Sequence, residues 1–73
     1  MELENNLAYL RKQQGLTQDA LAEKVAVTRQ TIISIEKGRF TPSTKLALLI
    51  ARELNQPLES IFWLRPSEKE SLS

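Results

Sequence analysis

Residues 17–38 limit the possible folds of this chain more than any other stretch; they read TQDALAEKVAVTRQTIISIEKG. Each half carries apolar residues on one side of a helix, at Leu21 and Val25 in the first half and at Ile32 and Ile35 in the second. Apolar residues three and four positions apart indicate a helix with one buried side. Because only about three residues separate the two halves, the helices must cross steeply, and the stretch predicts a helix-turn-helix.

Residues at the ends of both predicted helices agree with this prediction. Thr17 and Thr28 stand just before the apolar runs, where a hydroxyl can accept a hydrogen bond from an unpaired amide of the first turn. Gly38 is a typical helix stop, and the charge of the preceding Lys37 suits the negative end of the helix dipole. Ala22 is small enough for two helix backbones to approach closely at the crossing.

The chain resembles the Cro/C1-type helix-turn-helix family of bacterial and phage regulators, often called the XRE family. The matching segments are LTQ at 16–18, LA at 21–22, VTRQTI at 27–32, IE at 35–36 and Gly38, followed by PS at 42–43, LA at 46–47, IA at 50–51 and IF at 61–62. The resemblance implies an all-α fold: a five-helix lambda-repressor-like DNA-binding domain at residues 1–65, with a short polar tail at residues 66–73. One departure is Ala26, since the family usually has glycine in the turn; at positive φ, alanine costs about 1 kcal/mol relative to glycine.

Length and composition exclude several kinds of protein. A chain of 73 residues forms one domain and buries only about 60% of its unfolded surface, so it gains stability by pairing with a second copy. The chain has no cysteine, which excludes disulfides, and no histidine. A zinc site would therefore need carboxylates alone, and we expect neither a metal nor a cofactor. The residues that enzymes use for nucleophilic or acid–base chemistry do not form a recognisable set, so we expect no enzyme and no small-molecule ligand.

Because no apolar run approaches about 18 residues and the start, MELENN, is acidic, we expect a cytoplasmic protein without a membrane span or signal peptide.

Basic residues are concentrated in the middle of the chain. The net charge is only +1 and the pI is near 8.1, below the pI of about 9 that marks many nucleic-acid-binding domains. Residues 24–52 nevertheless carry six lysines and arginines against the single acid Glu36. Such segregation suits a surface that faces phosphates, although solvated lysines without a partner give the same pattern.

The second helix of the predicted motif, residues 29–37, carries the residues that we expect to read DNA bases. Arg29 and Gln30 lie in its first turn, the end that enters the major groove in this docking mode. A guanidinium can donate twice to guanine, and a glutamine amide can both donate to and accept from adenine. Ile33 can touch a thymine methyl, unless it is an ordinary exposed isoleucine. Ser34 is a weaker candidate because its hydroxyl suits a base edge or a phosphate equally well.

Polar and basic residues around the motif are candidates for phosphate contacts, which add affinity without sequence information. They are Gln18, Thr28, Thr31, Lys37, Arg39, Thr41 and Lys45. The resemblance implies the role of Gln18, which opens the first helix of the motif and can equally be a plain helix-start residue.

The resemblance also implies a structural ion pair beneath the motif, between Arg11 and Glu36. Arg11 lies on a predicted first helix, lined by leucines from Leu3 to Leu10, that emerges from a frayed arm at residues 1–6. Glu36 belongs to the inward side of its helix, where an unpaired carboxylate is costly.

The C-terminal part of the chain carries more apolar residues than its predicted core needs. A fourth helix is expected from near Ser43 to before Asn55 and a fifth at residues 58–62, with Phe40 in the preceding loop as a core plug. We predict a two-fold dimer whose interface is drawn from Leu48, Leu49, Ile61, Trp63 and Leu64. Alternatively, Trp63 folds back onto its own domain. The ending IFWLRP resembles the tails of very small dimeric repressors of the family, in which the tail extends as a strand.

Three functions are compatible with these residues. The first is a transcriptional regulator, with repression favoured over activation, that binds an inverted repeat in double-stranded DNA as a homodimer, with half-site centres about 34 Å apart. The second is an antitoxin of the same fold that binds DNA and masks a protein partner through Leu48, Leu49 and Trp63. The third is an interaction module without a DNA role, which the joint presence of Arg29 and Gln30 disfavours.

Overall fold

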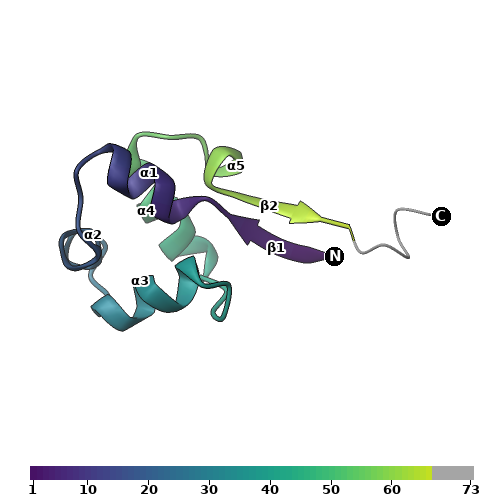
Figure 1. Ribbon diagram of the computed structural model, residues 1–73, viewed down its shortest axis with the longest axis horizontal. Coiled ribbons are helices and arrows are strands. Elements are labelled where there is room, and N and C mark those ends of the chain that lie inside the picture. Colours follow the sequence, from purple (N-terminus) through teal and green to yellow (C-terminus); the bar gives the residue numbers. More distant parts are fainter. Residues whose placement is uncertain (67–73) are drawn as a thin grey trace.

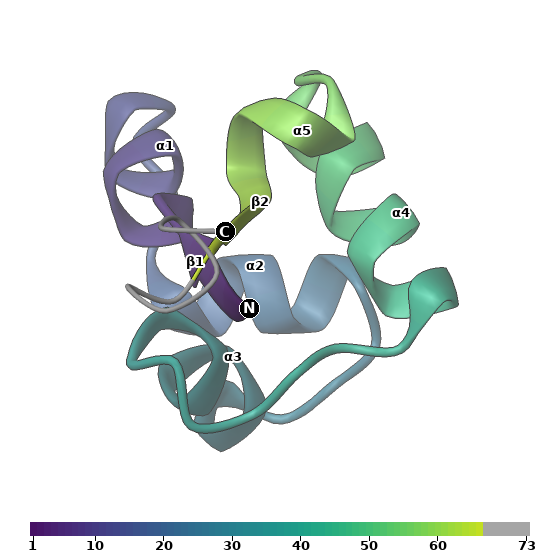
Figure 2. The same ribbon diagram turned by 90° about the vertical axis from the view of Figure 1, so that its right-hand side faces the viewer.

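The computed structural model describes residues 1–66, which form five helices and a two-stranded antiparallel sheet. In chain order the elements are β1 Glu2–Asn5, α1 Leu7–Gln13, α2 Gln18–Lys24, α3 Arg29–Glu36, α4 Thr44–Leu54, α5 Leu58–Ile61 and β2 Phe62–Arg65. The helices form the body of the molecule, and the two strands project from it as a ribbon with the N-terminus near its tip (Figures 1 and 2). The expected all-α fold is therefore wrong in one respect, because a small sheet joins the first and last elements. The predicted tail falls, apart from Pro66, outside the described residues.

Hydroxyl caps start three of the five helices. The side chains of Thr17, Thr28 and Ser43 accept hydrogen bonds from backbone N–H groups three residues further on, at 3.0, 3.4 and 3.1 Å. α3 ends before Gly38, whose φ is 73°, and α4 ends at Asn55, whose φ is 52°. Both residues are among those that adopt left-handed backbone at low cost, so the ends of these helices follow from local sequence.

A single apolar core lies between the helices and the base of the ribbon. Its buried members are Leu7, Leu10, Leu21, Ala22, Val25, Ile32, Ile35, Leu46, Ile50, Ala51, Leu54, Ile61 and Phe62. Phe40 is not among them; it is 48% exposed, so the prediction that it plugs the core is wrong. The N–H groups of Arg39 and Phe40 both donate to the Ser34 carbonyl, at 2.9 and 3.2 Å, which folds the loop back over α3 and leaves the phenyl ring at the surface.

A buried ion pair joins α1 to α3, as the family resemblance implies. Arg11 donates through Nε and Nη2 to the two carboxylate oxygens of Glu36, at 2.7 and 3.3 Å, and the two side chains are only 7% and 8% exposed. Two further hydrogen bonds extend the pair: Arg11 Nη1 donates to the Leu16 carbonyl at 2.8 Å, and Gln18 Nε2 donates to Glu36 at 3.1 Å. This network ties α1, α2 and α3 together without an unpaired buried charge.

The ribbon replaces the frayed arm that was expected at residues 1–6. β1 and β2 pair antiparallel with Leu3 opposite Leu64 and Asn5 opposite Phe62. The prediction that Leu3 lines the first helix is therefore wrong, because Leu3 belongs to a strand. It alternates with Glu2 and Glu4, which is the period of a strand and not of a helix.

Opposite charges cross between the two strands. Arg65 lies 3.0 Å from a Glu2 carboxylate oxygen and 2.9 Å from one of Glu4. The hydrogen bond to Glu2 and the charges of both carboxylates raise the pKa of Arg65 above its ordinary value. Because the Arg65 and Glu2 side chains are largely in solvent and the Glu4 side chain is 34% exposed, we expect the three to set the strand pairing more than the overall stability.

Removing one partner of the buried pair should be costly. We expect Arg11→Ala to lower the free energy of unfolding by about 3–5 kcal/mol, because the Glu36 carboxylate would stay buried without its charge partner. Urea unfolding monitored by circular dichroism measures this change. Arg52→Ala is the control, since Arg52 is 72% exposed and makes a surface pair with Glu53 at 3.7 Å, so that its removal should cost less than about 1 kcal/mol. Equal losses in both variants would show that the buried pair is not a main support of the fold.

Candidate nucleic-acid interface

The crossing of α2 and α3 sets the position of the candidate reading surface. Ala22 is buried at the crossing, and its carbonyl accepts from the Val27 N–H at 3.0 Å, which closes the turn. Ala26 within that turn has a φ of 60°, the conformation for which the family usually has glycine. α3 therefore leaves the turn in a fixed direction, with Ile32 and Ile35 inside the core.

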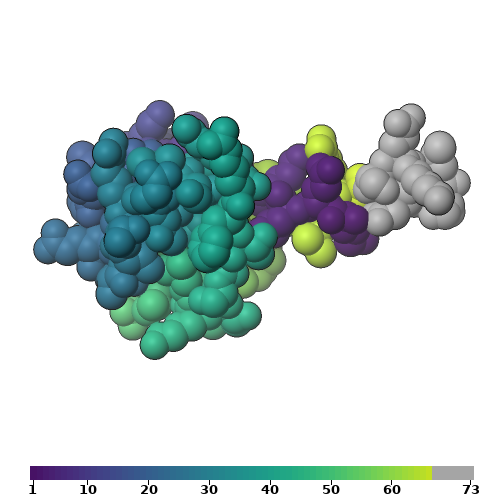
Figure 3. Space-filling model, turned by 90° about the horizontal axis from the view of Figure 1, so that it is seen from below, coloured from purple at the N-terminus to yellow at the C-terminus, as the bar shows by residue number. Residues whose placement is uncertain are grey.

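The outer side of α3 and the loop after it form a shallow hollow. Its lining residues are polar except for one, and they are Thr28, Gln30, Thr31, Ser34, Arg39 and Phe40. Seen from below, α3 and this loop occupy the middle of the face, and the ribbon projects to its right (Figure 3). Five of the residues predicted to contact DNA thus surround one concavity.

The four predicted base-reading residues differ in how they are presented. Arg29 and Gln30 are exposed in the first turn of α3, whereas Ile33 and Ser34 are half-buried. Arg29 lies 3.9 Å from Asp19, and both side chains are mostly in solvent. A pair of this kind contributes at most about 1 kcal/mol, so the guanidinium can leave it for another partner at little cost.

The predicted phosphate-contacting residues divide into those on this face and those away from it. Thr28 and Thr31 share a hydrogen bond at 3.2 Å between their hydroxyls and lie at the hollow together with Arg39. Lys37 is exposed at the C-terminal end of α3. The other two residues beyond α3 line different surfaces: Thr41 borders an apolar groove, and Lys45 lies on the outer side of α4.

Gln18 has a structural role in this state of the protein. It is half-buried, and its Nε2 donates to Glu36, which makes it the third member of the buried network. Its amide is therefore more than a plain helix-start group, and it links the beginning of α2 to the end of α3.

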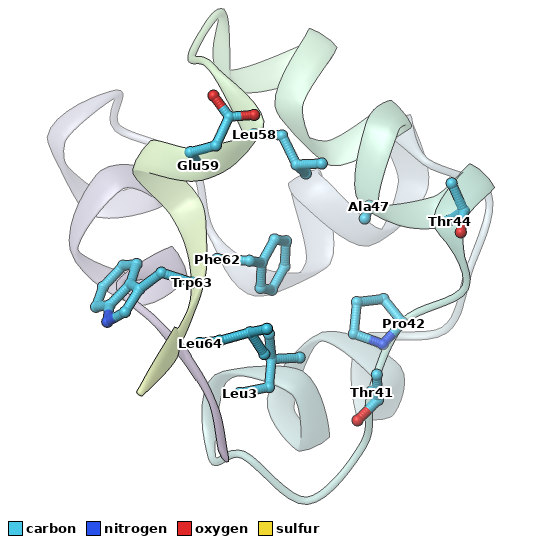
Figure 4. A pocket seen from close by; sticks show the side chains of 10 residues that line it. All are labelled: Leu3, Thr41, Pro42, Thr44, Ala47, Leu58, Glu59, Phe62, Trp63 and Leu64. Carbon is cyan, nitrogen blue, oxygen red and sulfur yellow. The ribbon is translucent and has the colours of Figure 1, made fainter. Parts of the chain in front are cut away.

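A second surface feature is an apolar groove between the ribbon, α4 and α5. It measures about 290 Å³ and is lined by Leu3, Thr41, Pro42, Thr44, Ala47, Leu58, Glu59, Phe62, Trp63 and Leu64. Figure 4 shows Leu3, Phe62 and Leu64 directed toward Pro42 and Ala47, whereas the Trp63 ring lies on the other side of β2. Leu64 is 60% exposed, so this end of the groove is open to solvent.

The structure does not bring the five predicted interface residues together. Ile61 is 0% exposed and packs in the core, so its assignment to an interface is wrong: α5 turns this side chain inward to close the body. Leu48 and Leu49 line a separate hollow on α4 with Lys45 and Arg52, and Leu49 also packs against the core. Only Trp63 and Leu64 lie at the groove.

The groove has contributors that sequence reasoning missed. Leu3 was placed on a helix, and Pro42 and Ala47 were read only as family and core positions. The signal for Leu3 was present in the short alternation of residues 2–5, which has the period of a strand.

Other kinds of site find no support in residues 1–66. Within this range no three side chains of the metal-binding types gather closely enough to hold an ion. The helices of the same range include none with the length and apolar character needed to cross a membrane.

Comparison with known proteins gives one family. The helix-turn-helix family model HTH_3 matches residues 7–61, so both strands of the ribbon lie outside the match. The chain is 50% identical over 60 residues to an uncharacterised HTH-type transcriptional regulator of Methanocaldococcus jannaschii, which covers 82% of this chain and 91% of that protein. It is 44% identical over 62 residues to the uncharacterised HTH-type transcriptional regulator YgzD of Bacillus subtilis, which covers 85% of this chain and 94% of that one.

Solved structures show the same fold. The restriction-modification controller protein C.AhdI from Aeromonas hydrophila superposes with a TM-score of 0.70 at 28% identity, over 74% of this chain and 82% of that chain. The clp gene regulator ClgR from Corynebacterium glutamicum superposes with a TM-score of 0.68 at 27% identity, over 71% of this chain and 55% of that chain.

The strained turn of the motif predicts a stabilising substitution. Ala26→Gly should raise the free energy of unfolding by about 1 kcal/mol, because glycine adopts a φ of 60° without the steric cost that alanine bears. Thermal and urea unfolding measure the gain. Ala47→Gly, in the regular helix α4, is the matched control and should lose about 1 kcal/mol. Loss of stability in both variants would contradict the assigned turn geometry.

Proposed function

This chain belongs to the HTH_3 helix-turn-helix family, and we propose that it regulates transcription by binding an inverted-repeat operator as a homodimer. The two sequence relatives described above are named HTH-type transcriptional regulators, and the C.AhdI structure is that of a restriction-modification controller protein. The observation that carries the proposal is the two-sidedness of α3. Ile32 and Ile35 hold one side in the core, while the opposite side, with exposed Gln30 and half-buried Ser34, borders a polar hollow that is open to solvent.

Base reading is assigned to the first half of α3. The Arg29 guanidinium presents paired N–H donors that match guanine O6 and N7, and the Gln30 amide matches the donor and acceptor of adenine. Both side chains stand at the helix end that enters the major groove in helix-turn-helix docking. Ile33 and Ser34 are half-buried about one turn later, and we propose that Ile33 contacts a thymine methyl and that Ser34, which lines the hollow, contacts a base edge.

Phosphate contacts are assigned to the rim of this face. Arg39 beside the hollow and Lys37 at the end of α3 are exposed cations that can reach a DNA backbone on either side of the groove. The hydroxyls of Thr28 and Thr31 can donate to the same strand. More distant phosphate contacts are proposed for Gln18, Thr41 and Lys45. Gln18 would donate the amide hydrogen that is not bonded to Glu36.

The ribbon and its groove are proposed to bind the second copy of the chain. Leu3 and Leu64 leave apolar surface open to solvent on the groove side of the ribbon, above the buried Phe62, and Trp63 exposes a further apolar ring on the other side of β2. A surface of this kind on a small domain is typical of an interface. A two-fold axis beside the ribbon would set two α3 helices on the same face of the dimer, and DNA requires them about 34 Å apart.

Repression is the favoured mode of regulation, because a dimer seated on an operator excludes polymerase without any further domain. The names of the relatives include no antitoxin, and Leu48 and Trp63, which that alternative joined into one surface, line different hollows. The antitoxin alternative therefore has no observation in its favour.

Substitutions at two arginines should separate base reading from phosphate binding. On an operator selected from a random duplex pool, Arg29→Ala should weaken binding by about 1–3 kcal/mol and relax the preference at one base position. Arg39→Ala should weaken binding to all duplexes similarly and lower the slope of log K against log salt by about one unit. Fluorescence anisotropy at several salt concentrations measures both effects. The division of roles fails if the two variants lose affinity equally on selected and random duplexes.

A second pair of substitutions tests the dimer. Leu64→Lys should convert the protein to monomers, because a charge in the apolar groove would be buried by the second copy. Leu48 is a matched control on α4, as the two leucines are 60% and 53% exposed, and Leu48→Lys should leave the dimer intact. Sedimentation velocity distinguishes monomer from dimer. A dimer that survives Leu64→Lys, or dissociates with Leu48→Lys, would place the interface elsewhere.

A further inference from the structure

We propose that Asn5 is a positioning residue, which fixes the recognition helix α3 relative to the β1–β2 ribbon and thereby sets the separation of the two reading surfaces. This inference rests on the proposed function, since it assumes a dimer formed through the ribbon. It assigns a DNA-binding role to a residue that lies outside the matched family region and far from the reading face in sequence.

The Asn5 side chain makes two hydrogen bonds that together fix its orientation. Its Nδ2 donates to the Ile35 carbonyl of α3 at 3.0 Å, and its Oδ1 accepts from the Leu7 N–H at 3.0 Å. A reversed amide would place NH₂ against an N–H and oxygen against a carbonyl, so only the observed orientation satisfies both partners. Asn5 therefore connects the end of β1 directly with α3, across 30 residues of sequence.

The Ile35 carbonyl lies in the last turn of α3, where carbonyl groups lack regular helical partners. The Arg39 N–H, which would continue the helical ladder to Ile35, donates to Ser34 instead. Ile35 accepts from Gly38 at 3.0 Å and uses its second lone pair for Asn5. Asn5 thus caps the recognition helix from another element.

The C-terminal end of α3, to which Asn5 donates, also receives hydrogen bonds from other helices. Glu36, the next residue, is fixed by Arg11 and Gln18. On the ribbon side, the Asn6 N–H donates to the Ile61 carbonyl at 3.1 Å, which fixes the base of β1 to α5. The bond from Asn5 therefore joins two firmly held parts, one that carries the proposed dimer surface and one that carries the reading residues.

This arrangement makes the direction of α3 dependent on Asn5. α3 runs along the lower edge of the body, and its C-terminal end is the end nearer the ribbon (Figure 1). A change of angle at Ile35 displaces the opposite end most, and that end carries Gln30. In a symmetric dimer the displacement occurs twice, so the separation of the reading surfaces responds to one hydrogen bond in each subunit.

Spin-label distances provide the test, and the absence of cysteine allows a single label at Gln30→Cys. We compare the distance distribution between the two labels of the dimer in the parent, in Asn5→Asp and in Gln14→Glu. Asn5→Asp keeps the acceptor for Leu7 and places an oxygen against the Ile35 carbonyl. Gln14→Glu makes the same chemical change at the end of α4, where Gln14 donates to the Leu54 carbonyl.

We expect one defined distance for the parent and for Gln14→Glu, and a broadened or shifted distribution for Asn5→Asp. Asn5→Ala, which removes the bond without adding charge, is measured in parallel and should also broaden the distribution. On duplexes whose half-site spacing differs by one base pair, we use unlabelled protein that retains Gln30, and the preference for the best spacing should be about tenfold lower in both Asn5 variants than in the unsubstituted chain.

The outcomes separate the two proposals. A parent without any defined inter-label distance would refute the ribbon dimer and thus the proposed function. The parent can show a defined distance that folded Asn5→Asp or Asn5→Ala reproduces, with an unchanged spacing preference. That result would overturn the role of Asn5 and leave the ribbon dimer standing. Equal broadening in Gln14→Glu would assign the effect to lost stability, which also overturns it.

Discussion

The ion pair between Arg11 and Glu36 is the interaction on which the arrangement of the first three helices depends. Glu36 is part of the reading helix, yet its carboxylate points into the protein and receives donors from α1 and α2. A buried carboxylate is tolerated only with such partners, so the three helices can close only in the arrangement that supplies them. The outer side of α3 is left free because its inner side satisfies both the apolar and the charged requirements of the core.

Local chemistry explains why sequence reasoning predicted the helix-turn-helix. Thr17 and Thr28 cap the helices at the predicted positions, and the strained turn at Ala26 was anticipated from a single departure from the family pattern. Each of these features depends on a few neighbouring residues, and so it can be derived from a short window of sequence. The Arg11–Glu36 pair is different: only the family resemblance, not the spacing, could join residues 25 positions apart.

The features that were mispredicted depend on contacts between distant parts of the chain. The strand β1 exists because residues 62–65 lie beside it, and nothing local to residues 2–5 separates a strand from a frayed arm except a short alternation. Phe40 was predicted to plug the core, but the Ser34 carbonyl, which accepts from the N–H groups of both Arg39 and Phe40, holds its loop at the surface. Ile61 is the opposite case, because it was predicted at an exposed interface and is buried. The buried side of a four-residue helix cannot be derived before the elements that pack against it are known.

The modest charge of the chain gives the ribbon its importance in the proposed function. A net charge of +1 and a few exposed cations near α3 supply a limited number of phosphate contacts per subunit. Because the electrostatic part of DNA affinity grows with the number of phosphates contacted, a single subunit should bind weakly, and pairing doubles the contacts only if both reading faces fit one duplex at once. In the proposed ribbon dimer, the geometry between the ribbon and α3 therefore governs affinity as well as site selection, and the bond from Asn5 to the end of α3 acts at the junction of the two.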